Sequence, residues 1–169
     1  MTISVVGAHW IDGEWIPSAG ATKFQAVSPV DGAVIGSVPE GGQAAAEAAI
    51  AAARRTFFQS QWASSPRLRA EVLLAQAASV EARSDDLSRL LSIETGKLIG
   101  VARMEIAAAA SELRYYAGLA RAVAGRMFEI EPGVYSHLVR EPAGVAAIIT
   151  PWNAPAILLG RSLGPALAA

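Results

Sequence analysis

The chain has 169 residues, of which 53 % are apolar and 17 % are charged, and its formal net charge at pH 7 is −1. This length suffices for one domain, or for a small domain and part of another. The near-neutral balance provides no basic stripe to follow a phosphate backbone, which argues against nucleic-acid binding. With no cysteine and two histidines, these residues exclude disulfides, thiolate metal sites, a cysteine nucleophile and a histidine-rich metal site.

Two stretches could be taken for targeting or membrane segments, and neither has the full pattern. Residues 1–15 contain no Lys or Arg and no long apolar run, unlike a signal peptide. Residues 144–169 are very apolar but are interrupted by prolines, glycines and Arg161, whereas a membrane span needs about 20 largely continuous apolar residues. We therefore expect a cytoplasmic protein with no membrane partner.

The beginning of the chain has the pattern of short strands and turns. Asp12-Gly13 lies between apolar residues, which is a strong hairpin signal. Residues 24–27 and 33–38 are strand candidates on either side of a turn at 29–32.

Apolar residues spaced three and four apart predict four consecutive helices. The first has Ala46, Ile50, Ala53 and Phe57 on one face. The second begins with Ser65 as N-cap and Pro66 in the first turn, and its apolar line is Val72, Leu73, Ala77 and Val80.

The third and fourth helices have equally clear boundaries. Ser84, followed by two aspartates that suit the positive helix end, starts the third helix, and Gly96 is a natural left-handed cap at its end. The fourth is expected to end at Gly125, and its apolar face consists of Ile99, Ala102, Ile106, Ala109, Leu113, Tyr116 and Ala120. Glu105 and Glu112 lie on this helix without a metal partner, and we interpret them as solvated surface residues.

Two different strand patterns follow. Residues 127–130 and 134–140, with a turn at 131–133, alternate in polarity, which predicts a β-ribbon with one solvated face. Residues 143–149 are apolar without alternation, as in a strand buried on both faces of a parallel sheet. A turn at 150–155 and an apolar helix come next, and strand, turn and helix in this order open a dinucleotide-binding unit.

Asn153, in the turn at 150–155, allows two interpretations. On spacing alone it is a favoured N-cap of the following helix. Alternatively its amide NH₂ points into a cleft and donates to a developing oxyanion. The neighbouring Trp152 is interpreted as a core residue. No strand partner and no helix cap follow before Ala169, so we expect the front portion of a larger α/β protein.

Ordered motifs across the chain resemble the NAD(P)-dependent aldehyde dehydrogenase family. The turn Ile149-Thr150-Pro151-Trp152-Asn153-Ala154-Pro155, preceded by Arg140-Glu141-Pro142-Ala143-Gly144-Val145, is the most specific. The others are Ser28-Pro29-Val30-Asp31-Gly32, Glu94-Thr95-Gly96-Lys97, Leu113-Arg114-Tyr115-Tyr116-Ala117-Gly118 and Leu163-Gly164-Pro165-Ala166-Leu167-Ala168.

The resemblance implies roles for particular residues. Asn153 matches the oxyanion-hole asparagine of the family. Four consecutive residues match the segment that contacts the NAD or NADP cofactor: Ile149, Thr150, Pro151 and Trp152. Four positions match those lining the aldehyde tunnel, and they suggest an aromatic aldehyde: Ala108, Ala154, Leu158 and Arg161. Arg161 would contact a polar ring substituent, or it would simply lie on a solvated face.

The resemblance also implies an incomplete α/β fold, a helical layer plus the first strand-helix unit of a Rossmann-like cofactor domain. The expected divisions are strands and turns at 1–41, the helical layer at 42–125, a β-ribbon oligomerisation arm at 126–141, and the strand-helix unit at 142–169. Contacts through 127–140 would make a homo-oligomer.

The catalytic cysteine and glutamate of the resembled family have no counterpart here, so we expect this chain to be inactive alone. Three alternatives remain open: a non-catalytic helical interaction module, one piece of a split enzyme, and a truncated gene product.

Overall fold

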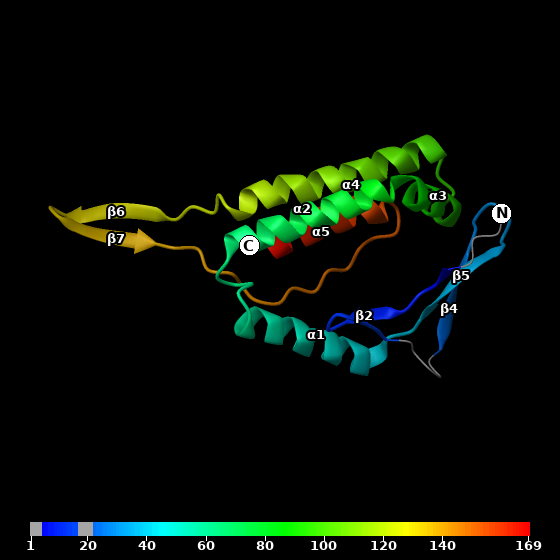
Figure 1. Cartoon of the computed structure of the whole chain (residues 1–169), viewed down its shortest axis with the longest axis horizontal. Coiled ribbons are helices and arrows are strands. Elements are labelled where there is room, and N and C mark those ends of the chain that lie inside the picture. The colour runs from blue at the N-terminus through cyan, green and yellow to red at the C-terminus, as the bar shows by residue number, and fades with distance from the viewer. Residues whose placement is uncertain (1–4, 17–21) are drawn as a thin grey trace.

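The computed structural model describes residues 5–16 and 22–169. Figure 1 shows a helical layer, a separate helix beside small sheets, and a two-stranded ribbon projecting from one end. Residues 1–4 and 17–21 of the predicted strand region lie outside the described residues.

The predicted hairpin is confirmed at the start of the chain. Strand β2 (His9–Ile11) pairs antiparallel with β3 (Glu14–Ile16), and Trp10 lies opposite Trp15. The two turn residues, Asp12 and Gly13, both have positive φ, 57° and 81°. Positive φ at both positions gives the turn whose twist matches that of the flanking strands.

A three-stranded sheet contains the other predicted strands. β5 (Val34–Pro39) lies between β1 (Val5–Val6), to which it is parallel, and β4 (Lys23–Val27), to which it is antiparallel. Gly32, at φ 70°, closes the turn between β4 and β5.

Helix α1 (Gly42–Gln59) forms where the sequence predicts it, but the predicted apolar face is not covered. Ile50 is 55 % exposed, and Ala52 is the buried residue of this helix. In Figure 1, α1 runs apart from the other helices. Helix α1 contacts β2, and a cavity lies between it and α5.

The predicted boundaries of the next two helices are confirmed. The Ser65 hydroxyl accepts a hydrogen bond from the Leu68 amide at 3.3 Å and caps α2 (Pro66–Ala82). Helix α3 (Ser84–Thr95) ends at Gly96, whose φ of 72° is the left-handed conformation that glycine adopts readily.

Helix α4 (Ile99–Ala120) is the centre of the layer, and it ends before the predicted Gly125. The amides of Arg121 and Ala122 bond to carbonyls three residues earlier, so the last turn tightens and the helix stops there. Gly125 instead lies against the ribbon, where a side chain would overlap the Leu138 carbonyl oxygen.

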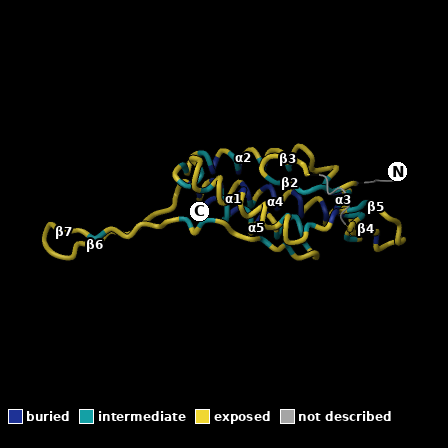
Figure 2. The backbone as a smooth tube through the Cα atoms, turned by 90° about the horizontal axis from the view of Figure 1, so that it is seen from below, coloured by how far each residue is buried: buried dark blue, intermediate teal, exposed yellow. Residues whose placement is uncertain are grey.

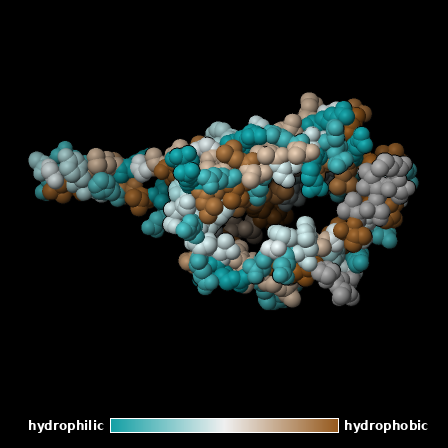
Figure 3. Space-filling view, in the orientation of Figure 1, coloured by the Kyte–Doolittle hydropathy of each residue, from teal (hydrophilic) through white to brown (hydrophobic). Residues whose placement is uncertain are grey.

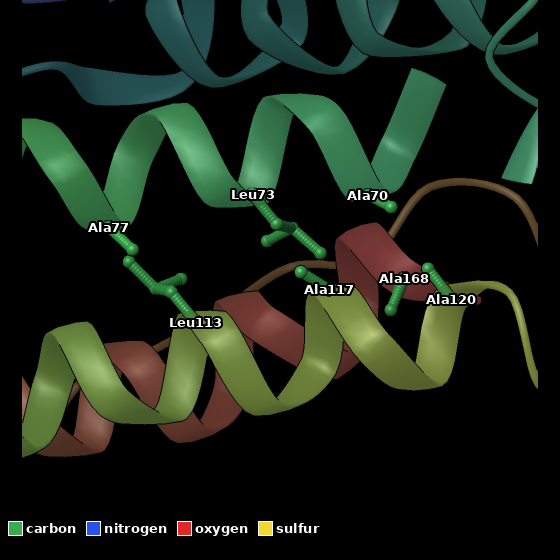
Figure 4. Close-up of a cluster of buried hydrophobic side chains, with 7 residues drawn as sticks. All are labelled: Ala70, Leu73, Ala77, Leu113, Ala117, Ala120 and Ala168. Carbon is green, nitrogen blue, oxygen red and sulfur yellow. The ribbon is translucent and has the colours of Figure 1, made fainter. Parts of the chain in front are cut away.

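The core of the layer lies between α2, α4 and α5 (Pro155–Ala168), as Figure 4 shows. Leu73 is fully buried, and most of its neighbours are alanines, which let the helix axes approach closely. The cluster consists of Ala70, Leu73, Ala77, Leu113, Ala117, Ala120 and Ala168.

The predicted ribbon is confirmed as β6 (Arg126–Glu131) paired antiparallel with β7 (Val134–Leu138). The expectation of a single solvated face is wrong for this chain. Every residue of β6 is exposed, and Figure 2 shows the ribbon extending away from the body. Both faces are solvated because no described element packs against either.

The prediction of a buried strand at 143–149 is also wrong. The segment is extended, but its backbone makes no hydrogen bond with any other described residue. Ile149 is 94 % exposed. A strand needs a neighbour to satisfy its amides and carbonyls, and none of the described strands lies beside it.

Candidate functional site

The turn at 150–154 links the extended segment to α5, and it carries the candidate site. Trp152 is 82 % exposed, so its interpretation as a core residue is wrong. The reason is that the layer is already filled by α2, α4 and α5, and no described element covers the outer side of this turn.

Asn153 is exposed and does not cap the helix. Ala154 occupies the N-cap position, and no side chain of the turn bonds to the first amides of α5. The helix-cap interpretation of Asn153 is therefore wrong. Its amide makes no hydrogen bond with a described residue, which leaves both NH₂ hydrogens available to a ligand.

A distant carboxylate satisfies the beginning of α5 instead. Oε1 of Glu105, on α4, accepts a hydrogen bond from the Ala156 amide at 2.9 Å. Its other oxygen pairs with the ammonium group of Lys97, in the loop after α3. The side chains of Glu105 and Lys97 are 6 % and 18 % exposed. A negative charge at this end also complements the helix dipole.

The interpretation of Glu105 as a solvated surface residue is thus wrong. For Glu112 the same interpretation is partly correct, because its side chain is 25 % exposed. Glu112 is partly exposed, and its carboxylate accepts from Nε of Arg161 at 3.1 Å. Glu105 differs because it lies beside Ile106 on the buried side of α4, where only pairing makes a charge tolerable.

The other end of α5 is bound by a buried arginine. Nε of Arg69, on α2, donates to the carbonyl oxygen of Ala168 at 3.1 Å. Its Nη1 donates to the carbonyls of Trp62 and Ala63 at 2.8 and 3.1 Å. Burial lowers the pKa of the Arg69 guanidinium, but an arginine remains charged at neutral pH.

Of the candidate tunnel residues, Ala108 lies on α4, Leu158 and Arg161 lie on α5, and Ala154 immediately precedes α5. Ala108 is one helical turn before Glu112, and Leu158 is three residues before Arg161. The bond between Glu112 and Arg161 links these two helices. The Arg161 side chain remains 56 % exposed, so it is paired and still accessible.

The residues matched to the cofactor segment form an open wall. Ile149 and Trp152 present almost their whole side chains to solvent, and the backbone beside them is not hydrogen-bonded to described residues. An extended, unpaired backbone with exposed apolar side chains suits one side of a nucleotide cleft. The residues present therefore fit NAD or NADP as one wall of its site.

A hollow lies on the other side of the extended segment, between α1 and α5. Figure 3 shows it as an apolar recess inside the molecule. The cavity has a volume of about 650 Å³, and Phe57, Val145 and Leu163 are among the residues that line it. Asn153 is not among its lining residues, so this space is separate from the candidate site.

Within residues 5–16 and 22–169, no helix has the length and apolarity needed to cross a bilayer. The same residues contain no cluster of three potential metal ligands.

The sequence reasoning missed the structural roles of Glu105, Lys97 and Arg69. A usable signal existed for two of them. Glu105 lies three residues after Ala102, and Arg69 lies four residues before Leu73, so each falls on the apolar line of its helix. A charged residue on such a line needs a buried partner.

Comparison with known proteins places these observations in context. The model of the aldehyde dehydrogenase family matches residues 15–169. The betaine aldehyde dehydrogenase of Bacillus subtilis is 36 % identical over 162 residues, which is 95 % of this chain and 33 % of that protein.

Solved structures agree with the sequence matches. An NAD-dependent aldehyde dehydrogenase from Sinorhizobium meliloti superposes with a TM-score of 0.94 at 34 % identity, over 99 % of this chain and 34 % of the other. A betaine aldehyde dehydrogenase from Staphylococcus aureus, solved with NAD⁺, gives a TM-score of 0.87 at 35 % identity, over 94 % of this chain and 32 % of the other. The chain thus spans about a third of the length of its relatives.

Proposed function

Because this chain belongs to the aldehyde dehydrogenase family over residues 15–169, we propose that it is the N-terminal part of an enzyme oxidising an aldehyde to a carboxylic acid. NAD or NADP would accept the hydride from the aldehyde carbon. The observation that carries the proposal is that Asn153, just before α5, is exposed and does not cap the helix. The relatives of this chain are aldehyde dehydrogenases.

The role of Asn153 in this reaction is to stabilise charge. When a nucleophile adds to the aldehyde carbonyl, negative charge develops on the carbonyl oxygen. The Asn153 amide donates a hydrogen bond to that oxygen. A donor held in place before reaction stabilises the charge without reorganisation. The nucleophile itself must come from residues other than these, because the chain has no cysteine.

The segment before Asn153 binds the cofactor in this proposal. Its backbone amides and carbonyls are unpaired with described residues, and its exposed apolar side chains can cover an apolar ring. The segment comprises Ile149, Thr150, Pro151 and Trp152. Their place directly before Asn153 puts cofactor and oxyanion contacts at one end of α5.

We further propose an aromatic aldehyde as the substrate. The small side chains of Ala108 and Ala154 would leave room for a ring in the complete site, and Leu158 would supply an apolar side chain beside it. Arg161, half-exposed beside Glu112, offers donors to a polar ring substituent. A preference for short aliphatic aldehydes would contradict this assignment.

The ribbon β6–β7 is proposed as the homo-oligomerisation arm. Its strands expose Met127, Phe128 and Ile130 to solvent, and exposed strand edges need a partner or protection. We also propose the division of the chain expected from the sequence, namely strands and turns at 1–41, the helical layer at 42–125, the arm at 126–141 and the strand-helix unit at 142–169.

A chimera tests the proposed function. Residues 1–169 would replace the matching third of the Bacillus subtilis betaine aldehyde dehydrogenase, and aldehyde-dependent NADH formation would be measured. We expect activity in the chimera, and a loss of about 10²–10³ in kcat in its N153A variant. N153Q, which keeps the amide but moves it by one methylene, tests placement. A folded but inactive chimera would contradict the proposal.

The isolated chain separates the remaining alternatives. Alone it should form no NADH from any aldehyde, because it lacks the thiolate nucleophile. A split enzyme predicts activity on mixing with a separate polypeptide carrying the other two-thirds of the fold. A non-catalytic module predicts none. NADH formation by the purified chain alone would contradict the assignment of its chemistry.

A further inference from the structure

We propose that Glu105 and Arg69 are positioning residues that hold α5 at its two ends and thereby fix the turn carrying Asn153. The importance of that turn rests on the proposed function. The contacts of Glu105 and Arg69 with the two ends of α5, which we call the clamp, lie entirely within this chain. In addition to its apolar packing against α2 and α4, helix α5 is contacted by opposite charges at its opposite ends.

The N-terminal contact acts directly behind the turn. Pro155 has no amide hydrogen, so the Ala156 amide is the first donor of the helix, and Glu105 accepts from it at 2.9 Å. Ala156 is three residues from Asn153. Displacing this amide would move the turn with it. Lys97 pairs with the second carboxylate oxygen and fixes its orientation.

The C-terminal contact prevents movement at the opposite end. Arg69 binds the Ala168 carbonyl, one of the last carbonyls of α5, which have no partner within the helix. Two more of its bonds reach Trp62 and Ala63, before α2 begins. The guanidinium thus ties the end of α5 to the start of α2. Positive charge here complements the negative end of the helix dipole.

The middle of α5 cannot supply this axial restraint alone. Gly160 faces the Ala109 backbone, and Gly164 faces the Tyr116 ring so closely that a Cβ would overlap it. These glycines let the two helices approach, and the polar contact in the middle of α5, between Arg161 and Glu112 of α4, is partly exposed to solvent. The buried charged contacts at both ends add an axial constraint that a solvent-exposed pair supplies only weakly.

Stability alone does not account for these buried charges. Well-packed apolar residues of similar volume often replace a buried ion pair without loss of stability. The two charges fix the direction of α5, because Glu105 accepts from an amide, found at the N-terminal end, and Arg69 donates to a carbonyl, found at the C-terminal end. Shifting α5 by one turn would break both contacts with its ends, leaving Glu105 with Lys97 alone and Arg69 with the carbonyls of Trp62 and Ala63.

Nuclear magnetic resonance of the whole chain tests this inference. Asn153 is the only asparagine, so labelling with [¹⁵N]asparagine gives one backbone signal and one pair of side-chain NH₂ signals at the turn. Uniform labelling reports hydrogen exchange at Ala156. We expect E105A to raise Ala156 exchange about tenfold or more and to shift the Asn153 signals. E105Q, which keeps an acceptor oxygen, should give a smaller shift in the same direction.

The control variant is E112Q. Glu112 is on the same helix but contacts a side chain of α5 rather than its end, so the Asn153 signals should not move. For the other end, R69M should speed exchange in the last turn of α5, whereas R67M, on the exposed side of α2, should not.

Unchanged Ala156 exchange and unchanged Asn153 signals in E105A would overturn the proposal. If E105A does not fold, the same result in E105Q overturns it. Because no activity is measured, an inactive chimera would count against the proposed function and not against the clamp.

Discussion

The helical layer and the segment that leaves it, residues 139–153, are built from similarly apolar sequence and have opposite environments. In the layer, small apolar residues of three helices are buried against one another, and Leu73 is fully enclosed. In the segment, Val139 and Ile149 are 74 % and 94 % exposed. Apolar character alone does not separate the two regions.

The difference lies in where the backbone hydrogen bonds go. Each helix satisfies its own amides and carbonyls, so it can form before a partner arrives and then needs only a packing face. An extended segment satisfies none of its own and depends on a neighbouring strand. The layer therefore assembles from residues present here, whereas 143–149 has no described neighbour to pair with.

The largest predicted effect lies within the layer. Leu73→Ala should lower the free energy of unfolding by about 2–5 kcal/mol, since it removes a fully buried side chain and leaves a cavity. Urea denaturation measures the loss. The next residue provides the control: Leu74 is 44 % exposed, and L74A should cost much less. Equal losses would mean that the buried face of α2 is assigned incorrectly.

The approach of α5 to α4 should show a smaller effect. Gly164→Ala places a Cβ against the Tyr116 ring, and overpacking of this kind costs about 1–3 kcal/mol. In α4, Gly118 has open space around it, so G118A should stabilise by about 0.5–1 kcal/mol. Thermal unfolding of both variants checks the opposite signs, and a stabilised G164A would contradict the close packing.

The exposed segment should respond differently. Ile149→Ser should change the free energy of unfolding by less than about 0.5 kcal/mol, because its side chain is 94 % exposed. It should instead reduce self-association, measured by sedimentation velocity, since it removes exposed apolar surface. The same substitution at Ile106, which is 5 % exposed, should unfold the chain. A large loss in I149S would show that the segment is buried in solution.

The smallest effect concerns pH. The hydrogen bond from Arg114 lowers the pKa of Glu81 below its usual 4.5 and raises that of Arg114. Because the folded pKa is the lower one, this pair stabilises the fold above pH 4.5, and the contribution is lost as the pH falls through the folded value.

The melting temperature should therefore fall slightly more steeply below pH 4.5 in the wild-type chain than in E81Q. Glu71→Gln is the matched control, because Glu71 pairs with Arg67 inside α2 rather than across to α4. Parallel profiles for wild type and E81Q would show that the pair contributes nothing.

Signals that act within a few residues predicted the fold well. Asp12-Gly13 identified its hairpin, Ser65 its cap, and Gly96 its helix end, because each depends on local geometry. The apolar line of α4 was correct at Ala102, Ile106, Ala109, Leu113 and Ala120, which are buried, whereas Ile99 is 40 % exposed. The ends of elements were less predictable, as the early end of α4 shows.

Predictions that depended on which elements pack against a segment were wrong. Residues 143–149 have the composition of a buried strand, and Trp152 that of a core residue, but burial depends on what lies alongside. For Asn153 the cap was assigned locally, whereas the helix start is satisfied by Glu105, which is 51 residues before the Ala156 amide that it accepts from. The burial of Glu105 could have been predicted from its place on the apolar line of α4, but its partners, Lys97 and the Ala156 amide, could not. The proposed oxyanion role of Asn153 came from the family resemblance.

The exposed indole of Trp152 is an intrinsic fluorescent probe of the turn before α5. Any event that covers the turn, whether a nucleotide ring, a further strand or a second polypeptide, moves this indole from water into a less polar medium and shifts its fluorescence emission to shorter wavelength. Trp10, Trp15 and Trp62 lie far from Trp152 in the sequence, so replacing them with phenylalanine would isolate the signal.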